Sequence, residues 1–412
     1  MIDGEHYAPV VRAALEELPY EFVGALLVGG TEKLRPGADY GVPLAADLET
    51  ALAELEPEVV VDLSDEPVLG PVRRFRLASS VLAAGVPYVG ADFRLDAPEF
   101  LPCPIPSIGV IGTGKRIGKT ALTGHIARLL GEERRVVVVA MGRGGPPEPE
   151  LVELPPTLER LLELSRDGRH AASDHLETAA LAGVPTIGCT RCGGGLAGAP
   201  AVSNVGAGLA LALDLSPDLV VLDGSGAAIP PVATGARVLV AGASQAPELV
   251  TGYLNAYRIL ISDLVVLTMA EEGTPHERVA AAVREVKDLP VVPVVLRPRP
   301  LGAIGGRRVA YFSTASPEAL PLLERHLREQ YGADVVHVSG NLARRDVLEA
   351  ELEGLDVDVY LVEIKAAAID VVAEAAAARG LDVVFADNEV LPLPGADLDD
   401  QLRTLTAERV AS

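Results

Sequence analysis

The chain alternates short apolar runs with longer amphipathic segments rich in Ala, Leu and Glu. Short apolar runs bounded by turn residues predict buried strands, and apolar positions at helical spacing predict helices. Strands are expected at 22–28, 58–63, 107–112, 135–141, 184–189, 218–223, 236–241, 263–269, 291–296, 307–313, 333–338, 357–364 and 382–386. Helices are expected at 119–130, 157–166, 274–288, 317–330 and 367–379. This alternation predicts an α/β fold with a mostly parallel sheet.

Two Pro-rich segments interrupt the pattern and suggest domain boundaries. The run APEFLPCPIPS (97–107) precedes an apolar strand, and RPRPLGAIGGRR (297–308) reads as a Pro/Gly/Arg linker. A chain of 412 residues is long enough for several domains. We therefore expect an N-terminal α/β domain at 1–103, a central domain at 104–296 and a C-terminal α/β domain at 297–412.

Composition and charge limit the partners. The 35 basic and 58 acidic residues give a net charge of −23, which excludes a generic basic surface for nucleic acid. The start MIDGEHY has no basic or apolar signal region, and the longest uncharged stretch, 192–213, contains helix-breaking Gly and Pro. Three cysteines, an odd number, are typical of a reducing compartment. We expect a cytoplasmic protein without nucleic-acid or membrane partners.

The strongest local motif is SIGVIGTGKRIGKTALTGHIARLL at 107–130, where a strand leads through a Gly-rich turn into a helix. In such a P-loop the backbone amides surround nucleotide phosphates, Lys119 reaches the β- and γ-phosphates, and Thr120 binds Mg²⁺. The expected ATP-binding residues are Gly112, Thr113, Gly114, Lys115, Arg116, Ile117, Gly118, Lys119 and Thr120. Thr113 stands where the strict pattern has its first glycine. A simple Gly-rich turn is the alternative, and it does not explain three basic side chains in the loop.

A second motif, DLVVLDGSG at 218–226, is an apolar strand that ends in Asp223. The loop GTGKRIGKT looks like that of dethiobiotin synthetase and related P-loop ligases, and this strand resembles their Walker B strand. Asp223 would then hold Mg²⁺ directly or through water, whereas the alternative is an ordinary turn after a strand. No N-K-x-D guanine motif occurs among the five lysines, which favours ATP over GTP.

Eight runs, taken in order, resemble the cyclic 2,3-diphosphoglycerate synthetase family. They are IDGEHY (2–7), GTGKRIGKT (112–120), MGRGGP (141–146), SDHLETA (173–179), GCTRCGGGLAG (188–198), LDGSG (222–226), EIKAAAIDV (363–371) and FADNE (385–389). Of these only the P-loop is specific by itself, and the resemblance extends nearly from end to end. It implies ATP-dependent closure of 2,3-diphosphoglycerate to its cyclic form with release of ADP and phosphate. It also implies Mg²⁺, with K⁺ as a further candidate cofactor, and we expect a homo-oligomer (a dimer).

The substrate of such an enzyme carries two phosphates and a carboxylate, so its site needs concentrated positive charge and close backbone amides. Lys119, Lys115 and Arg116 are expected to stabilise the transferring phosphoryl group as catalytic residues. Thr120 and Asp223 are expected to hold the metal. The candidates for substrate binding are Arg143, Gly144, Arg191, Gly193, Gly194, Lys365 and His6.

The sequence is also compatible with other functions and with other roles for single residues. A P-loop amide ligase would activate a carboxylate, a phosphoglycerate kinase would stop before cyclisation, and a nucleotide-switched binding module would not turn over substrate. Asp174 either caps a helix together with Ser173 or has a role linked to the metal, as Glu177 also could. Cys189 and Cys192 form a lone pair, which favours incidental thiols over a zinc site.

Overall fold

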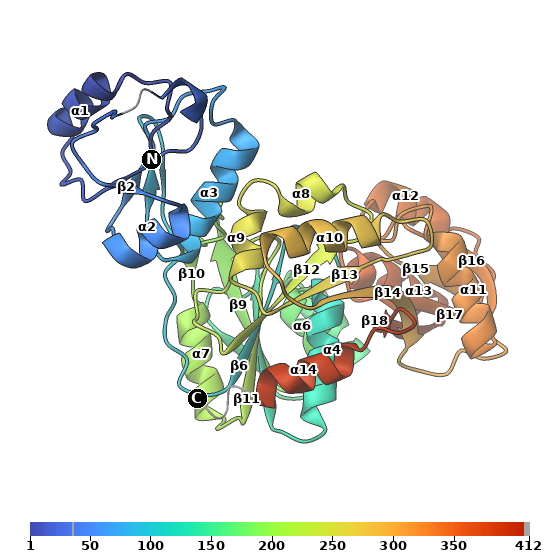
Figure 1. Ribbon diagram of the computed structural model, residues 1–412. Coiled ribbons are helices and arrows are strands. Elements are labelled where there is room, and N and C mark those ends of the chain that lie inside the picture. Colours follow the sequence, from blue (N-terminus) through green and yellow to red (C-terminus); the bar gives the residue numbers. More distant parts are fainter. Residues whose placement is uncertain (35–36, 408–412) are drawn as a thin grey trace. The chain divides into compact units, whose positions relative to one another are not determined.

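The computed structural model describes residues 1–34 and 37–407, which divide into two compact units (Figure 1). Unit 1 comprises Met1–Glu99, Gln245–Ser262 and Glu277–Asp288, and unit 2 comprises Phe100–Ser244, Asp263–His276 and Leu289–Ser412. Among the described residues, no helix has the length and apolar character needed to cross a membrane.

Unit 1 is a small α/β unit with short strands. Its elements are α1 (Ala8–Glu17), β1 (Ala25–Leu26), η1 (Thr31–Lys33), β2 (Leu44–Ala45), α2 (Leu48–Leu55), β3 (Val60–Val61), α3 (Pro71–Ala83), β4 (Tyr88–Val89), β5 (Arg94–Leu95), α8 (Pro247–Thr251), α9 (Asn255–Leu260) and α10 (His276–Val286). β1 pairs with β2 and β3 pairs with β4 in parallel, whereas β5 is antiparallel to β4. The start of the chain lies between these pairs, because Ile2 bridges to Leu27 and the Met1 ammonium donates to the Val61 carbonyl at 2.6 Å.

Unit 2 is built on one large sheet, which has thirteen strands in the described part of the chain. Its order is β10-β9-β7-β11-β6-β12-β13-β14-β18-β17-β15-β16, and β8 pairs with β9. The elements of its first part are β6 (Ser107–Gly112), α4 (Lys119–Gly131), β7 (Val136–Gly142), β8 (Glu150–Val152), α5 (Leu158–Arg166), α6 (Asp174–Ala182), β9 (Thr186–Cys192), β10 (Val202–Ser203), α7 (Val205–Asp214), β11 (Leu219–Asp223), β12 (Ala236–Gly242), β13 (Leu264–Thr268) and β14 (Val291–Pro300). The remaining elements are β15 (Arg308–Phe312), α11 (Leu320–Tyr331), β16 (Asp334–Ser339), α12 (Arg345–Leu352), β17 (Val359–Glu363), η2 (Ala368–Ala373), α13 (Glu374–Arg379), β18 (Asp382–Pro392) and α14 (Leu398–Ala407).

The central strands are buried on both faces, which explains their continuous apolar sequence. Val136 and Val138 of β7 pack in the core cluster that contains residues of α4 and α14, whereas Val137 and Val139 pack in the cluster on the α7 side. Successive side chains of a strand point to opposite faces, so a strand between two helical layers needs apolar residues at every position. The predicted α/β fold with a mostly parallel sheet is confirmed.

The strands in the two halves of this sheet run in opposite directions. β14 is parallel to β13 over its first residues and antiparallel to β18 from Val294 to Pro300. β18 is in turn parallel to β17, and β17 to β15. The carboxyl ends of β15 and β17 therefore point towards the edge at which β6, β7 and β11 end.

The element boundaries differ from expectation in several places. The strand expected at 58–63 is only β3, and the strands expected at 291–296 and 382–386 extend to Pro300 and Pro392. Residues 297–300, expected in a linker, belong to β14 because they pair with β18. The strand expected at 22–28 is reduced to β1, which lies between Gly24 and Gly29, and glycine weakens a strand interior. The helix expected at 367–379 starts as the π-helix η2 before α13. The division into three domains stays a prediction, and the β14–β18 pairing joins the sheets of the second and third of them.

Candidate active site

The phosphate loop connects β6, which ends at Gly112, to α4, which begins at Lys119. Gly118 has φ +80°, a conformation that glycine adopts without strain, and it places the loop directly before the helix. Thr268 at the end of β13 donates a hydrogen bond from Oγ1 to the Ile117 carbonyl at 2.8 Å. The loop is thus held in place by a neighbouring strand, independently of any ligand.

Lys119 is largely withdrawn from solvent, with 8% of its surface exposed. Its Nζ donates to the Gly114 carbonyl at 2.8 Å, so the side chain folds back across the loop. Burial lowers the pKa of Lys119, while the carboxylates of Asp223 and Asp174 act against that shift. A phosphate oxygen in this loop would supply the counter-charge that a buried ammonium lacks.

Asp223 ends β11 beside the phosphate loop and is 3% exposed. Burial raises the pKa of Asp223 to about 7, and the Lys119 ammonium opposes that rise. Its Oδ1 has no hydrogen-bond partner within the described residues. A buried carboxylate oxygen without a donor suits a hard cation such as Mg²⁺, which prefers oxygen ligands.

Asp174, the first residue of α6, belongs to the same cluster. A Cβ placed on Gly142 at the end of β7 would lie 3.1 Å from Asp174 Oδ2. Ser173 occupies the N-cap position without a side-chain cap bond and contacts His175 Nδ1 at 3.1 Å instead. The sequence is compatible with either a capping or a metal-linked role for Asp174, and in the structure its carboxylate interacts electrostatically with Lys119 and Asp223.

Basic side chains from three neighbouring strand ends lie around Gly226. A Cβ on that residue would lie 3.5 Å from Arg191 Nη2, 3.7 Å from Lys115 Cγ and 3.8 Å from Arg143 Nη2. Lys115 and Arg143 lie in the loops after β6 and β7, Arg191 lies near the end of β9, and Gly226 follows β11. Adjacent parallel strands end at the same edge of a sheet, which is where α/β proteins bind their ligands. Three separately predicted cations are thus brought together beside the phosphate loop.

Arg191 is fixed by its own loop and by the loop after β11. Its Nη1 donates to the Gly193 carbonyl at 2.7 Å, and its Nη2 donates to the Ser225 carbonyl at 2.8 Å. Gly194 lies next to it, because a Cβ there would be 3.5 Å from Arg191 Nη1. The pKa of Arg191 is lowered, mainly by burial and to a smaller extent by the positive charge of the nearby Arg143. Ser225 was not among the expected site residues, although it stands in the LDGSG run two residues after Asp223.

The remaining predicted cations of this edge are available to a ligand. Lys115, Arg116 and Arg143 are exposed and form no ion pair within the described part of the chain. Gly144, in the same loop as Arg143, packs against His170, whose Cδ2 would be 2.7 Å from an added Cβ. Together with Arg191, Lys115 and Arg143 place two guanidinium groups and one ammonium group in one small region, a concentration of positive charge that suits a polyanion.

Lys365 has a different environment. Its Nζ lies 3.2 Å from Glu177 Oε1 and 3.7 Å from Glu363 Oε2. Burial by itself lowers the pKa of Lys365, but these two carboxylates outweigh it and raise the pKa, so the side chain is an ammonium ion. Lys365, which the sequence predicted to bind substrate, is therefore paired with two carboxylates of the protein itself.

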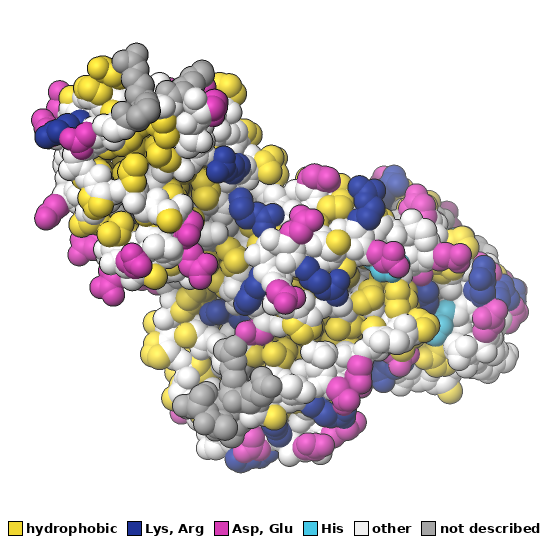
Figure 2. Space-filling view, viewed as in Figure 1, with side chains coloured by type: hydrophobic (Ala, Val, Ile, Leu, Met, Phe, Trp, Pro, Cys, Tyr) yellow, Lys and Arg dark blue, Asp and Glu magenta, His cyan; other side chains and the backbone are white. Residues whose placement is uncertain are grey.

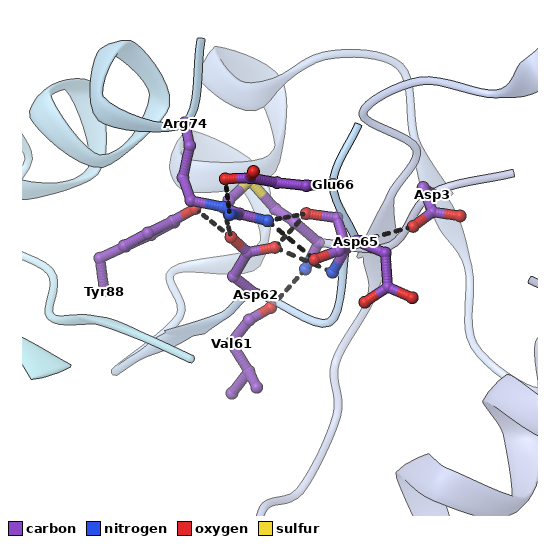
Figure 3. Close-up of polar contacts among 9 residues, drawn as sticks. Asp3, Val61, Asp62, Asp65, Glu66, Arg74 and Tyr88 are labelled. Carbon is purple, nitrogen blue, oxygen red and sulfur yellow. Dashed lines mark hydrogen bonds and ion pairs between the residues drawn. The ribbon is translucent and has the colours of Figure 1, made fainter. Parts of the chain in front are cut away.

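His6 lies in unit 1, within a separate polar network. Its Nδ1 is 2.8 Å from Asp3 Oδ1, and its Nε2 is 3.5 Å from Asp65 Oδ2. Asp3 also accepts a hydrogen bond from the Asp65 amide at 2.8 Å (Figure 3). Beside them Asp62 accepts from Arg74 Nε at 2.9 Å. This network holds the first residues of the chain against the loop that follows β3.

Three family models match consecutive parts of the chain. The N-terminal domain of cyclic 2,3-diphosphoglycerate synthetase matches residues 1–96, its P-loop domain matches 107–295 and its C-terminal domain matches 300–389. A cyclic 2,3-diphosphoglycerate synthetase of Rubrobacter xylanophilus is 56% identical, covering 94% of this chain and 93% of that protein. One of Thermococcus gammatolerans is 46% identical, covering 98% and 96%.

Similarity to solved structures is weaker. LpxK from Aquifex aeolicus, solved in complex with ATP, is 15% identical with a TM-score of 0.47, covering 81% of this chain and 96% of that chain. These values are too low to bear on the function.

Proposed function

Since the chain belongs to the cyclic 2,3-diphosphoglycerate synthetase family, we propose that it closes 2,3-diphosphoglycerate to its cyclic pyrophosphate at the expense of ATP. The observation that carries this proposal is the grouping of Lys115, Arg143 and Arg191 around Gly226, next to the buried Lys119. Two polyanions, ATP and a bisphosphorylated acid, repel each other strongly, and a concentrated set of cations allows both to bind at one place.

The proposed reaction has two phosphoryl-transfer steps. A phosphate oxygen of the substrate first attacks the γ-phosphorus of ATP, and the bond to ADP breaks. The second substrate phosphate then attacks the substrate phosphorus of the new anhydride and expels inorganic phosphate, which closes the ring. We assign Lys119, Lys115 and Arg116 to the charge of the transferring group, and Arg143, Arg191 and the amides around Gly144, Gly193 and Gly194 to the substrate. His6 remains a candidate for substrate binding.

We assign the metal to Thr120 and Asp223, because the Asp223 Oδ1 is buried without a donor. Bound Mg²⁺ would neutralise charge on the β- and γ-phosphates. K⁺ is proposed as an additional cofactor on the family resemblance alone. The family models support the expected division near residues 103 and 296, and we further propose a cytoplasmic homodimer that binds neither nucleic acid nor membrane.

Phosphorus NMR tests the reaction directly. The protein is incubated with Mg-ATP and 2,3-diphosphoglycerate, and the appearance of a cyclic pyrophosphate with equal amounts of ADP and inorganic phosphate is expected. ADP without inorganic phosphate would instead indicate a kinase that stops at the anhydride. Absence of turnover would refute the proposed activity for this substrate and would favour a carboxylate-activating ligase or a binding module.

Lys119→Ala tests the assignment of the phosphate loop. We expect turnover to fall by about 10³-fold or more, because a preorganised charge at the transferring phosphate is lost. Arg325→Ala, an exposed cation on α11, is the matched control and should keep wild-type turnover. Folding of both variants is checked by circular dichroism, and a folded Lys119→Ala variant with normal turnover would contradict the assignment.

A further inference from the structure

Three charged side chains inside unit 2 have no role in the proposed chemistry. Glu177 and Glu363 are 3% and 4% exposed, and the ammonium of Lys365 lies between them. Burying two glutamate side chains is costly, and such groups are retained in proteins where their partners are fixed. We therefore asked which part of the nucleotide site these three side chains hold in place.

Glu363 is anchored in the C-terminal strands. Its Oε1 accepts hydrogen bonds from Tyr311 Oη at 3.2 Å and Asn388 Nδ2 at 3.0 Å, and its Oε2 accepts from Thr314 Oγ1 at 3.4 Å. These donors come from β15, the loop after it and β18. Lys365 lies two residues further along, just after β17 ends, and so directly follows this anchored residue.

Glu177 lies on α6, three residues after Asp174, so both project from one side of that helix. Asp174 lies beside Gly142 at the nucleotide edge, whereas Glu177 pairs with Lys365. Leu176, between them, packs in the same core cluster as Phe312 of β15. One turn of α6 thus touches both the phosphate-loop edge and the C-terminal strands.

A second tie holds the other end of α6. Arg128 of α4 donates from Nη1 to the Leu181 carbonyl at 3.0 Å and pairs with Asp387 of β18 at 2.9 Å. Arg299 of β14 pairs with the same carboxylate at 2.9 Å. The C-terminal strands therefore fix α6 at both its first and its last turn.

We propose that Lys365 is a positioning residue: held by Glu363 and paired with Glu177, it fixes α6 so that Asp174 stays beside the phosphate loop. The proposal deepens the proposed function, on which its kinetic readout rests, because it assigns Lys365 to the geometry of the nucleotide site. Contact with the substrate is not required of this lysine.

The test compares Lys365→Met and Glu177→Gln with the double variant. Equilibrium binding of Mg-ATP and, separately, of 2,3-diphosphoglycerate is measured by calorimetry, followed by steady-state kinetics. Both single variants should bind Mg-ATP about tenfold more weakly and show a similarly lower kcat, since a small displacement of a site group has such effects. Affinity for 2,3-diphosphoglycerate without nucleotide should stay within about twofold of the wild type, because Arg143 and Arg191 are retained.

The double variant removes the pair without leaving an unmatched charge on Glu177. Its loss of Mg-ATP affinity should equal that of either single variant, because residues acting through one contact are not additive. Arg345→Met, which breaks the exposed pair with Asp370, is the control and should change none of these values. If Lys365→Met does not fold, Glu177→Gln and the double variant decide the matter.

Two results would overturn the proposal. Loss of 2,3-diphosphoglycerate affinity with intact Mg-ATP binding would make Lys365 a direct substrate ligand. Unchanged affinities and kcat in the folded variants would make the pair purely structural. If the wild type forms no cyclic product, the proposed function fails, but the binding of Mg-ATP still reports on the pair.

Discussion

Lysine and arginine make different contacts in this site because their charged groups differ in shape. Lys119 places a compact ammonium inside the loop, where its Nζ reaches the Gly114 carbonyl. Arg191 uses a planar group with several donors to join the Gly193 and Ser225 carbonyls. A compact ammonium group and a planar guanidinium group are therefore not interchangeable at these two positions.

Gly226 is a position at which a single added methyl group tests the cation cluster. A methyl group there would lie in ordinary contact with Arg191 Nη2, Lys115 Cγ and Arg143 Nη2, and it would take up space between these side chains. We expect Gly226→Ala to lower kcat/KM by about tenfold or more through displacement of bound phosphate. Because Gly226 has φ +62°, the variant should also lose about 1–2 kcal/mol of unfolding free energy.

Gly306→Ala separates the two effects. Gly306 has φ +70° and no atom within 4 Å of an added Cβ, so the substitution produces the same backbone strain away from the cations. Denaturant unfolding should show similar losses of stability for both variants, whereas only Gly226→Ala should lose activity. Equal activity of the two variants would mean that phosphate does not bind at this place.

Among the elements, α6 touches both the phosphate-loop edge and the C-terminal strands, and it also carries a buried histidine. His175 lies against β9, where a Cβ on Gly188 would be 2.6 Å from the His175 ring. Burial lowers the pKa of His175 to about 4, and its Nε2 has no partner among the described residues. The helix is thus packed around a neutral imidazole.

Acid should therefore weaken the fold through His175. Its folded pKa lies below the ordinary value of 6.5, so the unfolded chain binds the proton first. Stability should fall as the pH drops from 6.5 to 4, by up to about 3 kcal/mol from this group. Urea unfolding between pH 7 and 4 should show a smaller loss for His175→Phe, with partly exposed His276→Gln as the control. An unchanged pH profile for His175→Phe would contradict this assignment.

Site residues could be predicted from the sequence where a strand or helix has a recognisable local pattern of residues. Lys119 and Thr120 follow a strand and open a helix, and Asp223 ends an apolar strand, so their grouping follows from the rule for parallel strands. The surroundings of Lys365 could not be predicted in this way. They depend on the antiparallel pairing of β14 with β18, which brings Glu177 from a distant helix to the end of β17, and no local pattern encodes that contact.

For the whole molecule, charge is distributed differently at the surface and at the site. The face shown in Figure 2 carries acidic and basic side chains interspersed, in keeping with a net charge of −23 spread over the exterior. The cations around Gly226 are instead concentrated at one edge of one sheet. Net charge thus describes the solvated exterior and says little about the ligand.

Salt should consequently act in opposite directions on stability and on binding. Raising tetramethylammonium chloride from about 0.05 to about 0.5 M shortens the screening length severalfold and adds no alkali cation. The unfolding midpoint should rise because self-repulsion of the acidic exterior is screened, and the KM for 2,3-diphosphoglycerate should rise because its attraction to the cations is screened. Thermal unfolding and initial rates measure the two responses, and a KM that does not depend on salt would argue against the cation cluster as the substrate site.

The antiparallel junction of β14 and β18 has a consequence for the fate of an energy-rich intermediate. A phosphoric anhydride formed at one edge would be lost to hydrolysis if the next nucleophile had to diffuse to it. With the ends of β15 and β17 directed towards the ends of β6, β7 and β11, one continuous sheet carries both sets of strand ends. Coupling between ATP consumption and ring closure would then be a property of how the strands are joined.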